Sequence, residues 1–125
     1  MARILVIDDD DLVLSMLGRV LENAGHVVTV ASNGEVGIRL FREQPTDLII
    51  TDIIMPEKEG WETILELRGE FPHVKIIAIS GGGRQGPYGY LMLAKRFGAE
   101  RVFSKPLKSE ELLNAISELL GSTDQ

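Results

Sequence analysis

The sequence predicts an α/β protein with three layers, in which a parallel sheet carries helices on both faces. Five short apolar runs rich in branched residues alternate with five amphipathic segments along the chain. Turn residues, mostly glycine, proline and asparagine, separate the segments, and the chain contains no internal repeat or low-complexity stretch. Strictly alternating strands and helices require parallel strands joined by right-handed crossovers.

Length and composition restrict the class of protein further. A chain of 125 residues fits one domain, so we expect residues 1–125 to form a single unit without a separate output domain. The net charge of −6 argues against binding nucleic acid or an anionic membrane through bulk electrostatics. The chain has no cysteine, no apolar run near the length of about 20 residues that spans a bilayer, and no signal-peptide pattern, so we expect a cytoplasmic protein.

The first elements are a strand over residues 4–7 and an amphipathic helix over residues 12–24. Asp10 or Asp11 is placed to cap the start of this helix, and Gly25 is expected just after its end. Its apolar positions are Leu12, Val13, Met16, Leu17, Val20, Leu21 and Ala24. A second short strand follows over residues 27–31.

The functional interpretation depends most on an apolar strand in the middle of the chain. A helix begins at Asn33 and Gly34 and extends to about residue 42. The next strand, residues 48–52, has no alternation of polar and apolar residues, which is typical of a strand buried on both faces. It ends in Asp52, and a loop with Pro56 and Gly60 follows.

The remaining elements repeat the same alternation. We expect a helix over residues 61–69, a strand over 74–79 that ends at Ser80, and a helix over 90–97 after a glycine-rich segment, 81–89. A short strand over 101–104 leads to Lys105 and Pro106. Ser109, followed by Glu110 and Glu111, is expected to cap a last helix that reaches Leu120.

Polar residues follow four of the predicted strands, where the carboxyl ends of parallel strands share one rim of the sheet. They are Asp8 and Asp9, Asp52, Ser80 and Lys105. Carboxylates about 4 Å apart repel by roughly 4 kcal/mol at an effective dielectric near 20, so such a cluster favours a divalent cation. Oxygen ligands indicate Mg²⁺, with Mn²⁺ as a second candidate. A carboxylate such as that of Asp52 can attack phosphorus and form an aspartyl phosphate.

Each of these residues also has an ordinary structural interpretation. An aspartate often caps a helix or a turn, a serine often ends a strand, and a lysine is most often a solvated surface amine. Their order at four successive strand ends favours a site over these separate interpretations.

On these residues the sequence resembles the receiver domain of two-component response regulators, of the chemotaxis type, from residue 4 to about residue 120. The motifs that carry the resemblance are Ile7-Asp8-Asp9, Thr51-Asp52-Ile53-Ile54-Met55-Pro56 with Gly60, Ile79-Ser80-Gly81 and Ser104-Lys105-Pro106. The resemblance implies a five-stranded sheet in the order 2-1-3-4-5 with five helices.

The resemblance also implies a role for each site residue. Asp52 would be the phosphoacceptor, and Ser80, Lys105 and Gly81 would contact the phosphoryl group. The metal would be held by Asp8, Asp9, Asp52 and the backbone carbonyl of Ile54. The Lys105-Pro106 peptide is expected to be cis.

Three features depart from the family pattern. One is that neither Ile54 nor Gly82, at positions that tune hydrolysis in the family, can orient an attacking water through its side chain, so we expect a comparatively long-lived phosphoryl group. Receivers commonly carry an aromatic residue at the position of Val102, and Phe103 should face the other side of the strand by alternation. Ser80 and Val102 are therefore the switch candidates, with Ser80 expected to carry the coupling. The glycine-rich segment 81–89 has no Walker or dinucleotide-binding pattern, and we interpret it as a mobile loop rather than a nucleotide site.

The implied function is a phosphorylation-controlled signalling switch rather than an enzyme with turnover on a small molecule. The expected phosphoryl donor is a sensor histidine kinase or a histidine phosphotransfer protein, with an undetermined downstream partner or output domain and with phosphorylation-dependent homodimerisation left open. Two alternatives also stay open: an aspartyl-phosphate phosphatase or phosphotransferase, and a receiver-like interaction module that is not phosphorylated.

Overall fold

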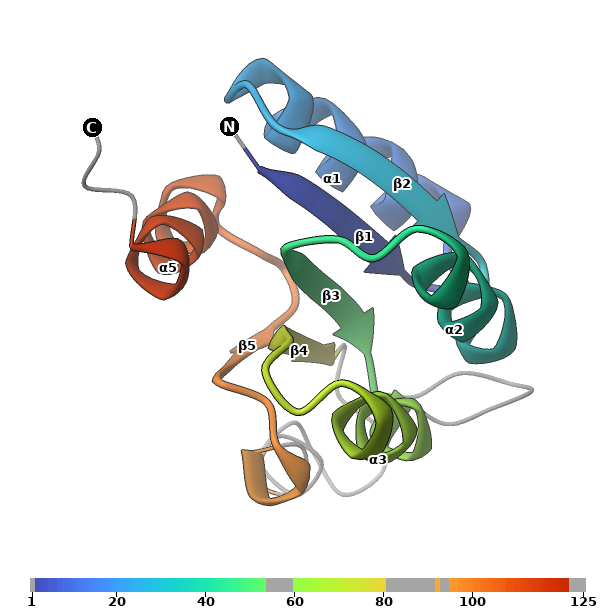
Figure 1. Cartoon of the computed structure of the whole chain (residues 1–125). Helices are drawn as coiled ribbons and strands as arrows, with labels where there is room; N and C mark the ends of the chain where they lie inside the picture. Colours follow the sequence, from blue (N-terminus) through green and yellow to red (C-terminus); the bar gives the residue numbers. More distant parts are fainter. Residues whose placement is uncertain (1, 54–59, 81–91, 93–94, 122–125) are drawn as a thin grey trace.

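The computed structural model describes residues 2–53, 60–80, 92 and 95–121, and Figure 1 draws the other residues in grey. The elements described are β1 (Arg3–Ile7), α1 (Asp11–Asn23), β2 (Val27–Ala31), α2 (Gly34–Glu43), β3 (Leu48–Asp52), α3 (Gly60–Glu70), β4 (Lys75–Ser80), β5 (Arg101–Ser104) and α5 (Ser109–Leu120). All neighbouring strands are parallel, in the order β2-β1-β3-β4-β5. The predicted fold class and strand order are confirmed.

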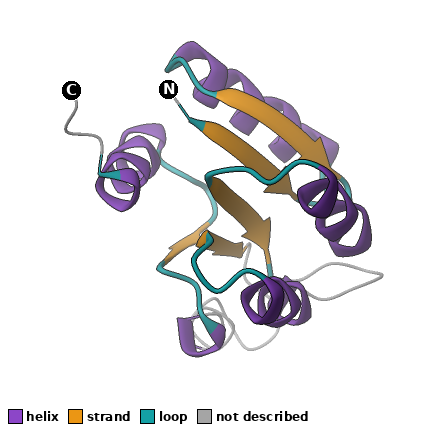
Figure 2. Cartoon of the chain, in the orientation of Figure 1, coloured by secondary structure: helices purple, strands orange, loops and turns teal. Residues whose placement is uncertain are grey.

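The sheet separates two apolar cores, because successive side chains of a strand point to opposite faces. One core joins Leu5 and Ile49 to α2 and α3, and the other joins Ile4 and Ile50 to α1 and α5. Figure 2 shows these helices on the two sides of the orange strands. All five residues of β3 are buried, as its unbroken apolar run predicts.

The capping prediction for α1 is confirmed, but its buried face differs from the predicted one. Asp10 accepts a hydrogen bond from the backbone N–H of Leu12 at 2.9 Å, and Gly25 follows the helix with a φ of 95°. Leu14, Leu17 and Leu21 are the buried residues. Leu12 and Met16 are 80% and 46% exposed, so the prediction that they belong to the apolar face was wrong. At 100° per residue they lie nearly opposite the 14-17-21 stripe.

The other element boundaries agree with the sequence within one or two residues, with one correction at α5. The side chain of Asn33 caps α2 by accepting from the N–H of Val36 at 2.9 Å. Ser109 was expected to cap α5, but Lys108 holds the cap position without a side-chain hydrogen bond and Ser109 is the first helical residue. Of the expected helix over 90–97, the structure describes helical residues at 92 and 95–97, and the rest lies outside the described residues. Among the described helices, none has the length and apolar character needed to cross a bilayer.

A single arginine ties three segments together at the end of the sheet away from the aspartates. The Arg68 guanidinium donates to the carbonyls of Val74 at 2.5 Å and Gly98 at 2.6 Å. It also pairs with the Glu100 carboxylate at 3.1 Å, and that carboxylate accepts from the N–H of Ile76 at 2.8 Å. The end of α3, the start of β4 and the turn before β5 are therefore held by one half-buried side chain.

Replacing Arg68 with methionine should lower the free energy of unfolding by about 2 kcal/mol, because it leaves half-buried carbonyls and a carboxylate without their donor. Denaturant unfolding followed by the fluorescence of Trp61, the sole tryptophan of the chain, measures the change. Arg39→Met on the exposed side of α2 is the matched control and should change stability by less than about 0.5 kcal/mol. Equal losses in the two variants would contradict the role given to Arg68.

Candidate functional site

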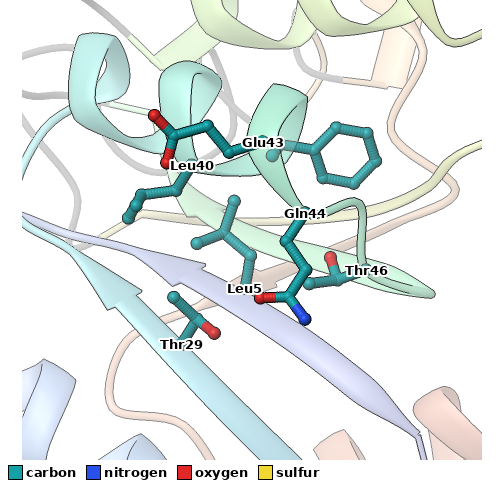
Figure 3. A pocket seen from close by; sticks show the side chains of 7 residues that line it. Leu5, Thr29, Leu40, Glu43, Gln44 and Thr46 are labelled. Carbon is teal, nitrogen blue, oxygen red and sulfur yellow. The ribbon is translucent and has the colours of Figure 1, made fainter.

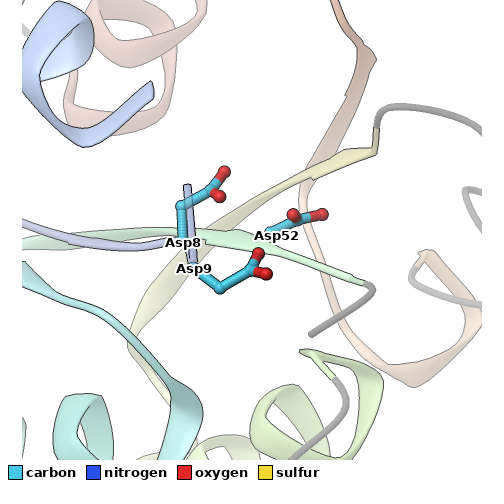
Figure 4. A group of neighbouring side chains, drawn as sticks. All are labelled: Asp8, Asp9 and Asp52. Atoms are coloured by element: carbon cyan, nitrogen blue, oxygen red, sulfur yellow. The ribbon is translucent and has the colours of Figure 1, made fainter. Parts of the chain in front are cut away.

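Three carboxylates converge at the carboxyl ends of β1 and β3. Asp8 and Asp9 directly follow β1, and Asp52 is the last residue of the neighbouring strand β3. Each contributes an oxygen to a group whose members all lie within 4.8 Å of one another. Figure 4 shows the three side chains directed toward a common space. Asp8 and Asp52 are buried and Asp9 is exposed, so the cluster opens to solvent on the Asp9 side.

Lys105 completes the cluster from across the sheet. Its Nζ lies 3.1 Å from Asp8 Oδ2 and 3.3 Å from Asp52 Oδ2. The backbone helps to fix this position, because the Lys105 N–H donates to the Ser80 carbonyl at 2.8 Å. The Lys105-Pro106 peptide is cis, as predicted. Partial burial opposes the charged amine, but Asp52 and Asp8 outweigh burial and raise the pKa of Lys105. The ammonium therefore stays protonated at neutral pH.

Asp8 is the most constrained of the carboxylates. Its Oδ1 accepts a hydrogen bond from the N–H of Asp10 at 2.9 Å, which links the site to the capped start of α1. Burial raises the pKa of Asp8, although the Asp10 N–H and Lys105 work in the opposite direction. Its Oδ2 is buried and meets no described donor in hydrogen-bonding geometry, despite the nearby ammonium.

The donor set fits a hard divalent cation. Three carboxylates supply oxygen ligands, the buried Asp8 Oδ2 has an unused lone pair, and Asp9 leaves one side open for water or a phosphate oxygen. This is the ligand pattern that Mg²⁺ prefers, since it binds through a few carboxylates and keeps several waters. Asp8, Asp9 and Asp52 could hold such an ion.

The structure places Ser80 and Val102 where the sequence predicted. Ser80 is the buried last residue of β4, at the same rim as Asp52, and pairs in register with Ser104. Val102 packs against the core on the α2 and α3 side, whereas Phe103 packs against the opposite core. The expected opposite orientation of these two side chains is confirmed. Ile54, Gly81 and the glycine-rich segment 81–89 lie outside the described residues.

Gly60 has a steric role at the site that its place in the sequence motif did not reveal. It is the first residue of α3, and its N–H donates to the carbonyl of Ile53 at 2.6 Å. A Cβ on Gly60 would lie within 1.8 Å of the Asp52 carbonyl oxygen and 2.5 Å of Ile53 Cα. The absence of a side chain therefore lets α3 begin directly against the peptide that carries the Asp52 carboxylate.

Replacing Asp8 with asparagine should stabilise the metal-free protein at neutral pH while weakening Mg²⁺ binding. Because the pKa of Asp8 is raised, the folded state binds more protons than the unfolded state between pH 3.8 and the folded-state pKa, so the contribution of Asp8 to stability is greatest at low pH. That contribution is lost as the pH rises through the folded-state pKa. Asparagine removes the buried charge, so urea unfolding at neutral pH should need more denaturant than for the wild type, and calorimetry should show weaker Mg²⁺ binding. A less stable metal-free variant would contradict the assignment.

Replacing Gly60 with alanine should lower the free energy of unfolding by about 1–3 kcal/mol, because the added methyl would overlap the backbone of Asp52 and Ile53, which must move. Gly69→Ala in the same helix is the control, since a Cβ there meets nothing within 4 Å. The control should be neutral or stabilising by about 0.5–1 kcal/mol. Calorimetric Mg²⁺ titration of both variants tests whether the Asp52 backbone has moved. Unchanged stability and unchanged Mg²⁺ affinity in Gly60→Ala would contradict the close contact between Gly60 and the Asp52 backbone.

Comparison with known proteins agrees with this geometry. The family model described as response regulator receiver domain matches residues 4–117. The chain is 32% identical to protein PilH of Pseudomonas aeruginosa, covering 97% of this chain and 99% of that protein. It is 34% identical to the response regulator receiver protein CpdR of Brucella abortus, with 96% and 98% covered.

Solved structures show the same relationship. A response regulator receiver domain protein from Clostridium thermocellum superposes with a TM-score of 0.89 at 32% identity, covering 99% of this chain and 98% of that one. A CheY-like receiver domain protein from Methanospirillum hungatei gives a TM-score of 0.89 at 27% identity, covering 99% and 97%. The chain belongs to the response regulator receiver domain family of two-component systems.

Proposed function

We propose that this receiver domain is a phosphoacceptor switch whose phosphorylated residue is Asp52. The observation that carries the proposal is the meeting of Asp52 with Asp8, Asp9 and the Lys105 ammonium at one rim of the sheet. Receiver domains act as signalling switches and generally bind Mg²⁺ at such an acidic cluster. The family does not by itself assign roles to the residues of this chain.

In the proposed reaction an Asp52 carboxylate oxygen attacks the phosphorus of a phosphohistidine. A new P–O bond forms and the P–N bond to the donor imidazole breaks. The electron pair of that bond goes to the ring nitrogen, which takes up a proton from water, so that neutral imidazole leaves. The donor is a sensor histidine kinase or a histidine phosphotransfer protein. Asp52 is the last residue of β3, so its carboxylate lies at the rim of the sheet, where a donor would approach.

Each neighbouring residue has a defined part in this step. Lys105, held protonated between Asp8 and Asp52, would pair with the phosphoryl oxygens and offset their charge. The buried Ser80 would donate its hydroxyl to another oxygen, with the Gly81 backbone beside it. Asp8, Asp9, Asp52 and the Ile54 carbonyl would hold Mg²⁺, or Mn²⁺ in its place, and a bound divalent ion supplies neutralisation of the phosphoryl charge.

The output of the switch would be a change in partner binding. The phosphoryl group would carry nearly two negative charges, about one more than the Asp52 carboxylate that it modifies, and this added charge beside Ser80 biases a two-state equilibrium of the domain. Because Val102 provides no aromatic ring to move inward, movement of Ser80 and of the segment after it would carry the coupling. A downstream protein, an output domain or a second phosphorylated copy would respond to that change.

Incubation with acetyl phosphate and Mg²⁺, followed by intact-protein mass spectrometry, should add one phosphoryl group to the wild type. Asp52→Asn should add none, because the amide is a poor nucleophile at phosphorus. Lys105→Met should lower the rate by about tenfold or more, through lost charge stabilisation. A phosphoryl group retained in Asp52→Asn would overturn the assignment. Release of inorganic phosphate with repeated turnover would favour a phosphatase, and no modification of a folded, Mg²⁺-binding wild type would favour an interaction module.

A further inference from the structure

The outer edge of β2 carries backbone groups without a strand partner among the described residues. β2 is the first strand of the sheet and pairs only with β1 within the described part of the chain. The Val27 N–H donates to the Ala2 carbonyl at 2.8 Å, and the Ala31 carbonyl accepts from the Asp8 N–H at 3.1 Å. Since the backbone direction alternates along a strand, Val28 and Val30 turn their N–H and C=O groups away from the sheet.

The two edges of this sheet are protected very differently. The β5 edge carries Arg101 and is flanked by Glu100 and Lys105, with Pro106 beyond. Such charges and prolines prevent strands of other molecules from pairing. Residues 26–34, which include β2, contain no aspartate, glutamate, lysine, arginine or proline. Val27 and Val30 are 49% and 47% exposed, so this edge is apolar as well as uncharged.

A hollow lies beside β2 on each face of the sheet. On the α2 side, the hollow in Figure 3 is lined by Leu5 of β1, Thr29 of β2 and Leu40 of α2, among other residues. On the α1 side a second hollow is lined by Leu14, Ser15, Gly18, Arg19, Glu22 and Val30. These hollows leave space on both faces for alternate side chains of an added strand.

We propose that the β2 edge pairs antiparallel with the β2 edge of a second copy, about a two-fold axis at Thr29. Val28 of each copy then faces Val30 of the partner. The outward N–H and C=O groups of these residues form interchain hydrogen bonds in the pattern of an antiparallel ladder. The two Thr29 residues face each other as a non-hydrogen-bonded pair, an arrangement favourable for threonine.

The helix beside the strand favours a second copy over an unrelated strand. α1 contacts β1 and β2, so continuing the sheet at about 4.8 Å per strand places the two α1 helices about 10 Å apart, the usual packing distance. Gly18 faces this space and a Cβ there would meet nothing within 4 Å. The two-fold axis reverses α1, which brings Arg19 of one copy toward Glu22 of the other.

Sedimentation velocity without a phosphoryl donor, from about 10 μM to about 1 mM protein, tests the proposal apart from the proposed function. The wild type should shift from monomer toward dimer as concentration rises. Thr29→Lys should weaken the dimer by about tenfold or more, because two like charges would face each other across the new ladder. The substitution also reduces the net charge from −6 to −5, so a nonspecific charge effect would strengthen association instead.

Leu65→Lys is the matched control, since it adds the same charge at an exposed position of α3, away from β2 and α1. It should leave the dimer intact, and thermal melts should show both variants folded. Slowed amide exchange of Val28 and Val30 in the wild type at high concentration would support the proposed pairing. A wild type that stays monomeric throughout overturns the proposal. So does a dimer lost in Leu65→Lys but kept in Thr29→Lys, or one in which the exchange of these two amides does not slow.

Discussion

The contact between Lys105 and the two buried carboxylates, Asp8 and Asp52, is the interaction around which the site is built. The three side chains come from the ends of β1, β3 and β5, and the ion pairs at 3.1 and 3.3 Å span the centre of the sheet. A parallel sheet makes this contact feasible because it brings the carboxyl ends of all strands to one rim. The apolar cores on both faces fix the strands and therefore the site.

The mutual repulsion of the carboxylates at the site is an electrostatic conflict that the folded protein compensates only in part. One ammonium faces three carboxylates, and burial raises the pKa of Asp8 even with Lys105 beside it. A fully compensated cluster would be more stable in the metal-free state but would have less affinity for a cation. This conflict is concentrated at Asp8 Oδ2, which is buried and paired with the Lys105 ammonium at 3.1 Å but accepts no well-directed hydrogen bond from a described residue. The charge of Asp8 that would help to bind a cation therefore lowers the stability of the metal-free protein.

Local contacts also position the backbone segments around the rim of the sheet. Gly60 starts α3 in contact with the Asp52 peptide, and the Asp10 cap joins the start of α1 to Asp8. At the opposite end, Arg68 fixes α3, β4 and the turn before β5. Binding an anion at the rim would therefore act on segments whose far ends are tethered. The edge of β2 lies apart from this arrangement, as the first strand of the sheet.

The sequence by itself determined the fold class, the strand positions and the identity of the rim residues. Unbroken apolar runs such as residues 48–50 and capping residues such as Asp10 and Asn33 are local signals, so they can be read without coordinates. The family resemblance added the strand order. Only the tertiary structure decided which side of α1 is buried, because Leu12 and Leu14 are equally apolar and the position of the sheet chooses between them. It also decided how close Gly60 lies to Asp52 and which oxygen of Asp8 lacks a donor, since both depend on contacts between segments distant in the chain.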